Sequence, residues 1–112
     1  MQNEIIKDLI CWIEKNLDKP LFISCISERS GFSKGHLQRM FSQVTGVSLG
    51  EYVRKRRLYL AAAELLNTDK KILEVALQFG YSDQQAFTRV FKYYYRTTPS
   101  KWRALYRENT RK

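Results

Sequence analysis

The sequence has few of the residues that build metal sites and nucleophilic active sites. It contains one histidine, His36, and two cysteines, Cys11 and Cys25, which do not form a Cys-x-x-Cys pair. A structural zinc site takes about four Cys or His ligands, and a nucleophilic cysteine needs a histidine base. We therefore expect no metal, no cofactor and no catalytic residue, so the protein is not expected to be an enzyme. Both cysteines are expected to be reduced and half-buried in helices, with a redox sensor as the alternative.

Long apolar runs are also missing. The longest spans only a few residues, and the first residues, Met1 to Glu4, contain no basic group leading into an apolar stretch. A membrane-spanning helix needs about 20 mostly apolar residues, and a signal peptide needs a basic segment followed by an apolar one. We expect neither feature in this chain, and no membrane partner.

Acidic residues are outnumbered. The chain has 11 Asp and Glu against 20 Lys and Arg, which gives a net charge of +9 and a pI near 9.8. With 112 residues, 44% hydrophobic and 28% charged, the composition is that of one globular domain. Such a basic domain favours a polyanionic partner, although charge alone does not separate DNA from RNA or from an anionic membrane.

Among the residues that are present, one pattern occurs twice. The segments Phe32 to Phe41 and Tyr81 to Phe91 each follow a glycine, and both place apolar residues at i, i+3 and i+4, which is one face of a helix. The positions on the opposite face have identical spacing: Lys34, Gly35, Gln38, Arg39 and Ser42 in the first helix, and Gln84, Gln85, Thr88, Arg89 and Lys92 in the second. Arginine and glutamine are the side chains that pair with guanine and adenine in the DNA major groove.

Hydrophobic periodicity and capping residues predict further helices around this pair. Residues 4–17 carry an amphipathic stripe with Trp12 at its rim, and Ser24 is expected to cap a short helix over residues 25–30. A glycine turn follows, and Ser33 caps the first repeated helix. Two short helices joined by a glycine turn, with the polar face on the second, form the helix-turn-helix pattern.

The second half of the chain repeats this order. Thr68 or Asp69 is expected to start a short helix over residues 71–79, and Asp83 is expected to cap the second repeated helix. A last helix is expected to begin at Thr98-Pro99 and to end near Tyr106. The sequence therefore predicts two helix-turn-helix units.

A long helix is expected to join the two units. Ser48 and Glu51 form a capping box, and apolar periodicity continues to about Asn67. A helix of about 18 residues is about 27 Å long, which would place the two polar faces close to one DNA turn, about 34 Å, apart. The helix carries Arg54-Lys55-Arg56-Arg57, and four consecutive cations spread around a helix, so we expect about half of them to reach DNA phosphates.

Six groups of residues, spread over nearly the whole chain, carry a family resemblance. They are Ile6-Lys7-Asp8-Leu9-Ile10 with Trp12-Ile13-Glu14, Asp18-Lys19-Pro20-Leu21, Ser33-Lys34 with His36-Leu37-Gln38-Arg39-Met40-Phe41, Tyr52-Val53-Arg54 with Arg56-Arg57-Leu58, Gln84-Gln85 with Phe87-Thr88-Arg89, and Thr98-Pro99. With them the chain resembles the DNA-binding domain of AraC/XylS transcription activators, and specifically the small free-standing members of the MarA, SoxS and Rob type.

The resemblance implies an all-α fold of seven helices, in which a long central helix bridges two helix-turn-helix subdomains. The implied single domain covers residues 1–112, with subdomains over about 4–47 and 68–106, a linker helix over about 48–67 and a basic tail over 107–112.

The implied function is sequence-specific activation of transcription. The family resemblance implies a monomer that docks on adjacent major-groove segments of double-stranded DNA, at an asymmetric and degenerate promoter site, and recruits RNA polymerase. It also implies a location in the bacterial cytoplasm on the nucleoid, and target genes for multidrug efflux, oxidative-stress defence and reduced permeability. Because the chain leaves no room for a sensor domain, we expect no small-molecule ligand, and activity set by the amount of protein.

The resemblance assigns roles to individual residues. The base-reading candidates are Lys34, Gly35, Gln38, Arg39, Gln84, Gln85 and Arg89. The candidates for contact with the DNA backbone are Ser33, His36, Ser42, Arg54, Arg57, Thr88 and Lys92. Trp12 and Lys15 are candidate contacts of RNA polymerase, and the alternative for Trp12 is packing over the edge of the core. Gly35 stands where close relatives have a tryptophan, which removes an apolar base contact and weakens the helix by about 1 kcal/mol.

A second class of function remains open at this point. The same helices and charges fit a nucleic-acid-binding module without activation, which would be a repressor or an architectural protein.

Overall fold

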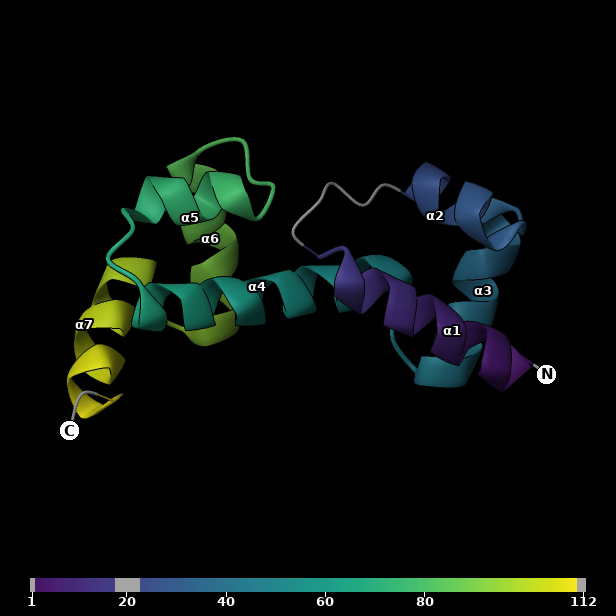
Figure 1. Cartoon of the computed structure of the whole chain (residues 1–112), viewed down its shortest axis with the longest axis horizontal. Helices are drawn as coiled ribbons and strands as arrows, with labels where there is room; N and C mark the ends of the chain where they lie inside the picture. The colour runs from purple at the N-terminus through teal and green to yellow at the C-terminus, as the bar shows by residue number, and fades with distance from the viewer. Residues whose placement is uncertain (1, 18–22, 111–112) are drawn as a thin grey trace. The chain divides into compact units, whose positions relative to one another are not determined.

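The computed structural model describes residues 2–17 and 23–110, and these residues form seven α-helices and no strand (Figure 1). The helices are α1 (Gln2–Lys15), α2 (Ile23–Ser30), α3 (Lys34–Thr45), α4 (Leu49–Asn67), α5 (Ile72–Gln78), α6 (Gln84–Tyr95) and α7 (Pro99–Thr110). The expected all-α class, with two helix-turn-helix units bridged by a long helix, is confirmed. The chain divides into two compact units, Met1–Arg56 and Arg57–Lys112, and the division falls within α4.

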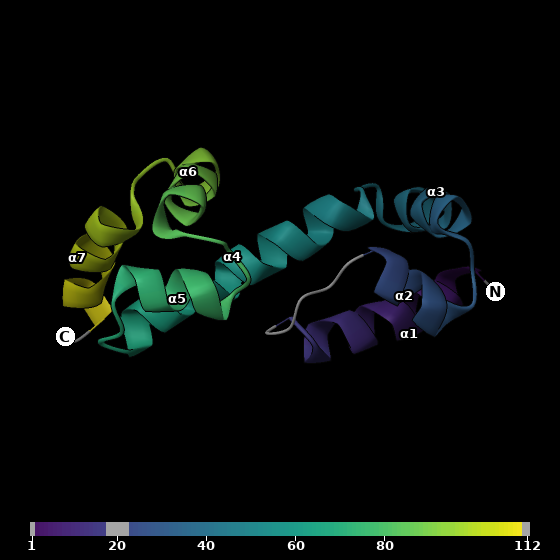
Figure 2. The same ribbon diagram turned by 90° about the horizontal axis from the view of Figure 1, so that it is seen from above.

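In the first unit, α1 and α2 both pack on α3 (Figure 2). The apolar stripes of these helices and of the start of α4 are buried: Ile6, Leu9, Ile13, Leu17, Ile26, Leu37, Met40, Phe41, Leu49 and Val53. Gly31 turns the chain between α2 and α3 with φ of +80°, a conformation that favours glycine, and its N–H donates to the Ser27 carbonyl over 3.0 Å. The buried stripe thus fixes which face of α3 is left outside.

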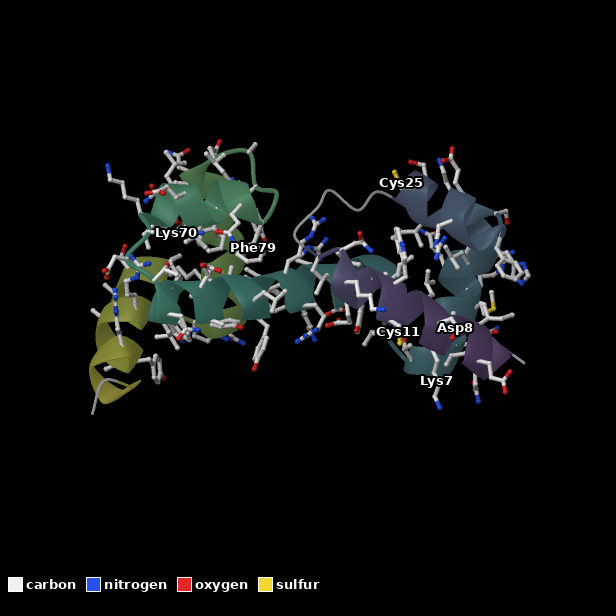
Figure 3. All side chains as sticks on the ribbon, viewed as in Figure 1. Lys7, Asp8, Cys11, Cys25, Lys70 and Phe79 are labelled. Atoms are coloured by element: carbon white, nitrogen blue, oxygen red, sulfur yellow. The ribbon has the colours of Figure 1, made fainter. Side chains whose placement is uncertain are left out.

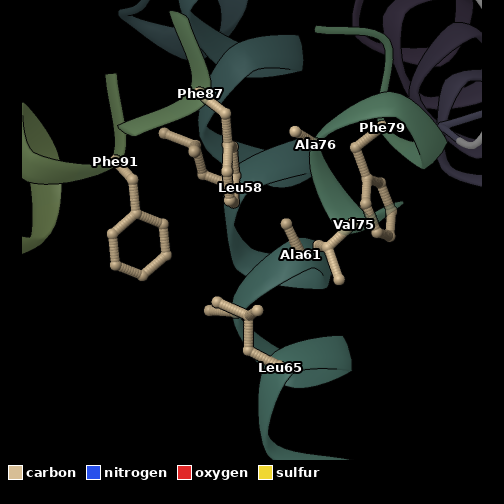
Figure 4. Packing of buried hydrophobic residues seen from close by; sticks show 9 residues of the cluster. Leu58, Ala61, Leu65, Val75, Ala76, Phe79, Phe87 and Phe91 are labelled. Atoms are coloured by element: carbon tan, nitrogen blue, oxygen red, sulfur yellow. The ribbon is translucent and has the colours of Figure 1, made fainter. Parts of the chain in front are cut away.

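In the second unit, α6 packs on both α5 and α7. Figure 4 shows Phe87 and Phe91 of α6 in one cluster with Leu58, Ala61 and Leu65 of α4 and with buried side chains of α5. The aromatic contacts continue into α7, where the Trp102 ring lies 5.8 Å from the Phe91 ring. Gly80, with φ of +89°, makes the turn between α5 and α6. The two phenylalanines therefore hold α6 with its polar face outward.

The expected caps are present at four helices. The hydroxyls of Ser33, Ser48 and Thr98 accept hydrogen bonds from backbone N–H groups three residues later, over 3.3, 3.1 and 3.3 Å. At α6 the cap is Asp83, whose carboxylate accepts from the Ala86 N–H over 2.7 Å. Each bond satisfies one of the N–H groups that a helix N-terminus leaves without an intrahelical partner.

Two of the expected capping residues were wrong. The backbone is already helical at Ile23, so Ser24 lies inside the first turn of α2 and is not its N-cap. The helix expected over residues 71–79 is present as α5, but its N-cap is Lys71 rather than Thr68 or Asp69. The Thr68 hydroxyl instead donates back to the Glu64 carbonyl over 2.8 Å and so belongs to the end of α4. The α5 start is stabilised by the Lys71 backbone N–H, which donates to the Glu74 carboxylate over 3.2 Å.

The cysteines also differ from expectation. Both are free, but they are exposed rather than half-buried, and Figure 3 labels them on α1 and α2. Cys11 lies about 200° around α1 from the buried Leu9, so it points away from the core, and Cys25 lies about 100° from the buried Ile26.

Side chains of α7 bond to the C-terminal end of α4 and to the residues that follow it. The Arg103 guanidinium donates to the backbone carbonyls of Leu65, over 2.8 Å, and Thr68, over 3.3 Å. Arg107 pairs with Asp69, and α7 continues to Thr110, past the end near Tyr106 that the sequence suggested. The segment Asp18 to Leu21, which contributes to the family resemblance, lies outside the described residues.

Candidate nucleic-acid interface

The outer face of α3 is polar. Leu37, Met40 and Phe41 are buried, so the helix is held by one face and the opposite one is left to solvent. All five positions expected on that face are exposed: Lys34, Gly35, Gln38, Arg39 and Ser42. The Lys and Arg cations and the Gln amide together offer the donors and acceptor that base edges and phosphates require.

The outer face of α6 repeats this arrangement. Gln84, Gln85, Arg89 and Lys92 are exposed and Thr88 is half-buried, while Phe87 and Phe91 lie in the core. Gln84, Gln85, Thr88 and Arg89 together line a shallow hollow of 470 Å³. The structure thus brings the second set of base-reading candidates onto one continuous surface.

The candidates for contact with the DNA backbone have different surroundings. Ser33 already accepts the capping hydrogen bond from the His36 N–H, and the His36 ring packs edge-on against Phe32 with 5.2 Å between ring centroids. Ser42, Arg54 and Lys92 are exposed. A phosphate contact is therefore sterically open to these three side chains.

The four cations of α4 separate into different roles. Lys55 lies 3.5 Å from the Glu51 carboxylate, and Arg56 makes a bidentate pair with Glu14. Arg57 is half-buried, and its Nη1 lies 3.3 Å from the point that a β-carbon on Gly80 would occupy. Burial lowers the pKa of Arg57 from its ordinary value. Arg57 thus packs over the turn between α5 and α6, whereas Arg54 points into solvent.

The candidate polymerase contacts lie on α1. Trp12 is half-buried, and the Arg29 guanidinium sits 5.8 Å from the centroid of its ring. Both side chains line a hollow of 410 Å³ together with Ile5, Asp8, Leu9, Ser30 and Phe32. Lys15 is exposed at the last residue of α1. The rim position expected for Trp12 is present, next to a cation that the sequence pattern did not indicate.

Sequence reasoning missed the group around Glu14. Its carboxylate accepts from the Tyr52 hydroxyl over 2.6 Å and from Arg56 Nε and Nη2 over 2.9 and 2.7 Å. The hydrogen bond from Arg56 is the main cause of the lowered pKa of Glu14, with smaller contributions from Tyr52. No local pattern marks this group, because Tyr52 and Arg56 lie 38 and 42 residues after Glu14 in the sequence.

Within residues 2–17 and 23–110, His, Cys, Asp and Glu side chains do not gather in a group of three or more that could hold a metal ion. None of the helices in these ranges combines the length and apolar character needed to cross a membrane.

Comparison with known proteins gives consistent matches. The family model described as a helix-turn-helix domain matches residues 26–105. The regulatory protein SoxS of Escherichia coli strain K12 is 49% identical over 100 residues, which cover 89% of this chain and 94% of SoxS. The transcriptional regulator Rob of Salmonella typhimurium is 46% identical over 109 residues, which cover 97% of this chain and 36% of Rob.

Solved structures share the fold. The chain is similar to a transcriptional regulator from Chromobacterium violaceum, described as one of the AraC-type DNA-binding domain-containing proteins. The TM-score is 0.82 at 28% identity, and the match covers 90% of each chain.

Proposed function

The chain belongs to the AraC-type helix-turn-helix family of DNA-binding transcription regulators, and from this we propose that it is an activator that binds a promoter site as a monomer. Helices α3 and α6 would enter adjacent major-groove segments of one asymmetric and degenerate site. The bound protein would then recruit RNA polymerase.

The observation that carries this proposal is the pair of matching polar faces on α3 and α6. Each helix has a side-chain cap at its start, a buried apolar face, and an outer face of five positions at the same spacing, of which all five in α3 and four in α6 are exposed. An arginine stands at the same place in both, Arg39 and Arg89. One chain that carries two such faces can read a site that has no symmetry, because a two-fold site is required only when two copies bind.

The proposed target genes are those that the family resemblance implies, and the match to SoxS over 94% of its length supports that resemblance. We propose genes for multidrug efflux, oxidative-stress defence and reduced permeability, and a location in the bacterial cytoplasm on the nucleoid. Trp12 and Lys15 are the proposed polymerase contacts.

Selection of bound sites from randomised DNA tests DNA reading first. We expect a consensus of two base clusters, bound at a ratio of one protein to one DNA in sedimentation. Affinity should fall steeply with salt, with each phosphate contact adding about 0.9 to the slope of log affinity against log salt. Selection of no sequence, or a ratio of two proteins to one site, would contradict the proposal.

Activation is tested separately, by in vitro transcription with purified RNA polymerase from a promoter that carries the selected site. We expect added protein to stimulate transcription, and the variant Trp12→Ala to bind DNA normally while stimulating less. Binding without stimulation would instead favour a repressor or an architectural protein.

A further inference from the structure

The Arg39 side chain lies back along α3 over Gly35. A β-carbon built on Gly35 would meet two atoms within 4 Å among the described residues, Arg39 Nη1 at 3.2 Å and Arg39 Cζ at 4.0 Å. This geometry is natural for a helix, because a long side chain points toward the N-terminus and covers the residue four positions earlier. The guanidinium therefore occupies the space that a side chain at position 35 would fill.

The backbone does not require glycine at this position. Gly31 and Gly46 have φ of +80° and +81°, where other residues are strained, but Gly35 lies within the regular part of α3. A contact of 3.2 Å is tight, so alanine would push the guanidinium aside slightly and a longer side chain would displace it. The structural consequence of Gly35 is thus the position of Arg39.

At two other places in the chain an arginine also follows four residues after the position compared with Gly35, but the surroundings of that position differ. In α6 the residues at the corresponding positions are Gln85 and Arg89, so a glutamine side chain is present where Gly35 has none. In α4 Gly50 precedes Arg54 by four residues, but a β-carbon on Gly50 would meet no atom of the described residues within 4 Å beyond its chain neighbours and the backbone of its own helix. A glycine four residues before an arginine is therefore not sufficient to fold the arginine back.

We propose that Gly35 and Arg39 form one specificity element, in which the Arg39 guanidinium reads the base that a side chain at position 35 would otherwise contact. This rests on the proposed function, because it assumes that α3 enters the major groove. A guanidinium donates two parallel hydrogen bonds to O6 and N7 of guanine, whereas a glutamine amide pairs with adenine. The first unit therefore selects guanine at the base that faces position 35. The second unit selects adenine, through Gln85, at the equivalent base of its own part of the site.

The experiment measures binding of the full chain to every single-base variant of the selected site. Arg39→Ala should abolish a guanine preference of about tenfold at one position. Gly35→Gln should reduce the guanine preference at that same position at least about fivefold and increase binding to adenine there. Gly35→Ala should change the same position less, because it displaces the guanidinium less.

Gly50→Ala is the matched control. Gly35 and Gly50 are both the second residue of their helix and both precede an arginine by four positions, so both alanine variants gain helix propensity. Gly50→Ala should leave all base preferences unchanged. Thermal unfolding should show that every variant is folded.

The inference is overturned if Gly35→Gln leaves all base preferences as they are in the unmodified chain, or if it changes a different base from Arg39→Ala. In either case the unmodified chain still selects a site, and the proposed function stands. If the unmodified chain selects no sequence at all, the proposed function itself fails.

Discussion

The Arg56 guanidinium holds the Glu14 carboxylate with two hydrogen bonds, from Nε to Oε2 over 2.9 Å and from Nη2 to Oε1 over 2.7 Å. Tyr52 adds a third, and the group connects α1 to α4 within the first unit. Bidentate pairs between arginine and a carboxylate are among the strongest polar contacts in proteins, and they fix orientation as well as distance. Arg56 therefore stabilises the first unit and is already engaged within it, although it stands in the run of cations that suggested DNA phosphates.

Replacing Glu14 by glutamine should destabilise the first unit by about 1 to 3 kcal/mol at neutral pH. The pKa of Glu14 is lowered by the hydrogen bond from Arg56, so its contribution is present above the ordinary pKa of 4.5 and is lost as the pH falls through the lower folded value. Urea unfolding at neutral and at acid pH should show the two proteins converge in acid. Glu28→Gln, at an exposed carboxylate on α2, is the control. A loss of equal size at both pH values would contradict this assignment.

Tyr52 should titrate at unusually high pH. Burial, and then the hydrogen bond to Glu14, raise its pKa to about 12. Its contribution to stability is therefore complete below the ordinary pKa of 10.0 and is lost as the pH rises through about 12. Ultraviolet absorbance during alkaline titration should lose a step near pH 12 in Tyr52→Phe. The same change at Tyr93, which is 74% exposed, should leave that step in place.

Arg39 should contribute to sequence-specific DNA binding, whereas Arg54 should contribute to sequence-independent binding. Arg39→Ala is expected to cost about 1 to 3 kcal/mol on the selected site and to relax preference at one base, whereas Arg54→Ala should weaken all sequences about equally. Arg54 is the appropriate phosphate variant because it is exposed, while Arg57 packs over Gly80. Binding to the single-base site variants at several salt concentrations measures both effects. A uniform loss for Arg39→Ala would refute its base-reading role.

Loss of the Asp83 cap should destabilise the second unit. Asp83→Ala removes the acceptor of the Ala86 N–H and a negative charge at the N-terminus of α6, at a cost of about 1 kcal/mol. Ser82→Ala, one residue earlier and also exposed, should have little effect. Thermal unfolding distinguishes the two variants, and equal melting temperatures would contradict the capping role.

Replacement of Arg103 should lower the free energy of unfolding of the second unit. Arg103→Ala leaves the Leu65 and Thr68 carbonyls without its two donors, so a loss of about 1.5 to 3 kcal/mol is expected. Arg103→Lys keeps the charge but not the planar fork, and should recover only part of that loss. Urea unfolding checks the order of the three proteins, and full recovery by lysine would show that charge alone is sufficient.

Local patterns in the sequence were sufficient for most of the helices. The buried side chains of α6, Phe87 and Phe91, recur with the period of a helix, and Asp83 marks its start, so neighbouring residues alone predict its exposed face. The expected capping residues that were wrong, Ser24 and Thr68 or Asp69, lie where several polar residues could act as caps. Thr68 instead bonds back to α4 and Asp69 pairs with Arg107, a partner 38 residues away.

The sequence by itself determined the all-α class and the two matching polar faces, because both depend on spacings of a few residues, and it indicated the family through a resemblance in residues spread over nearly the whole chain. Only the tertiary structure decided which group each of the cationic side chains on α4 contacts. Arg56 turns to Glu14, and Arg57 covers Gly80. The physical reason is that a long charged side chain can take many rotamers, and its choice depends on what the folded chain brings within reach.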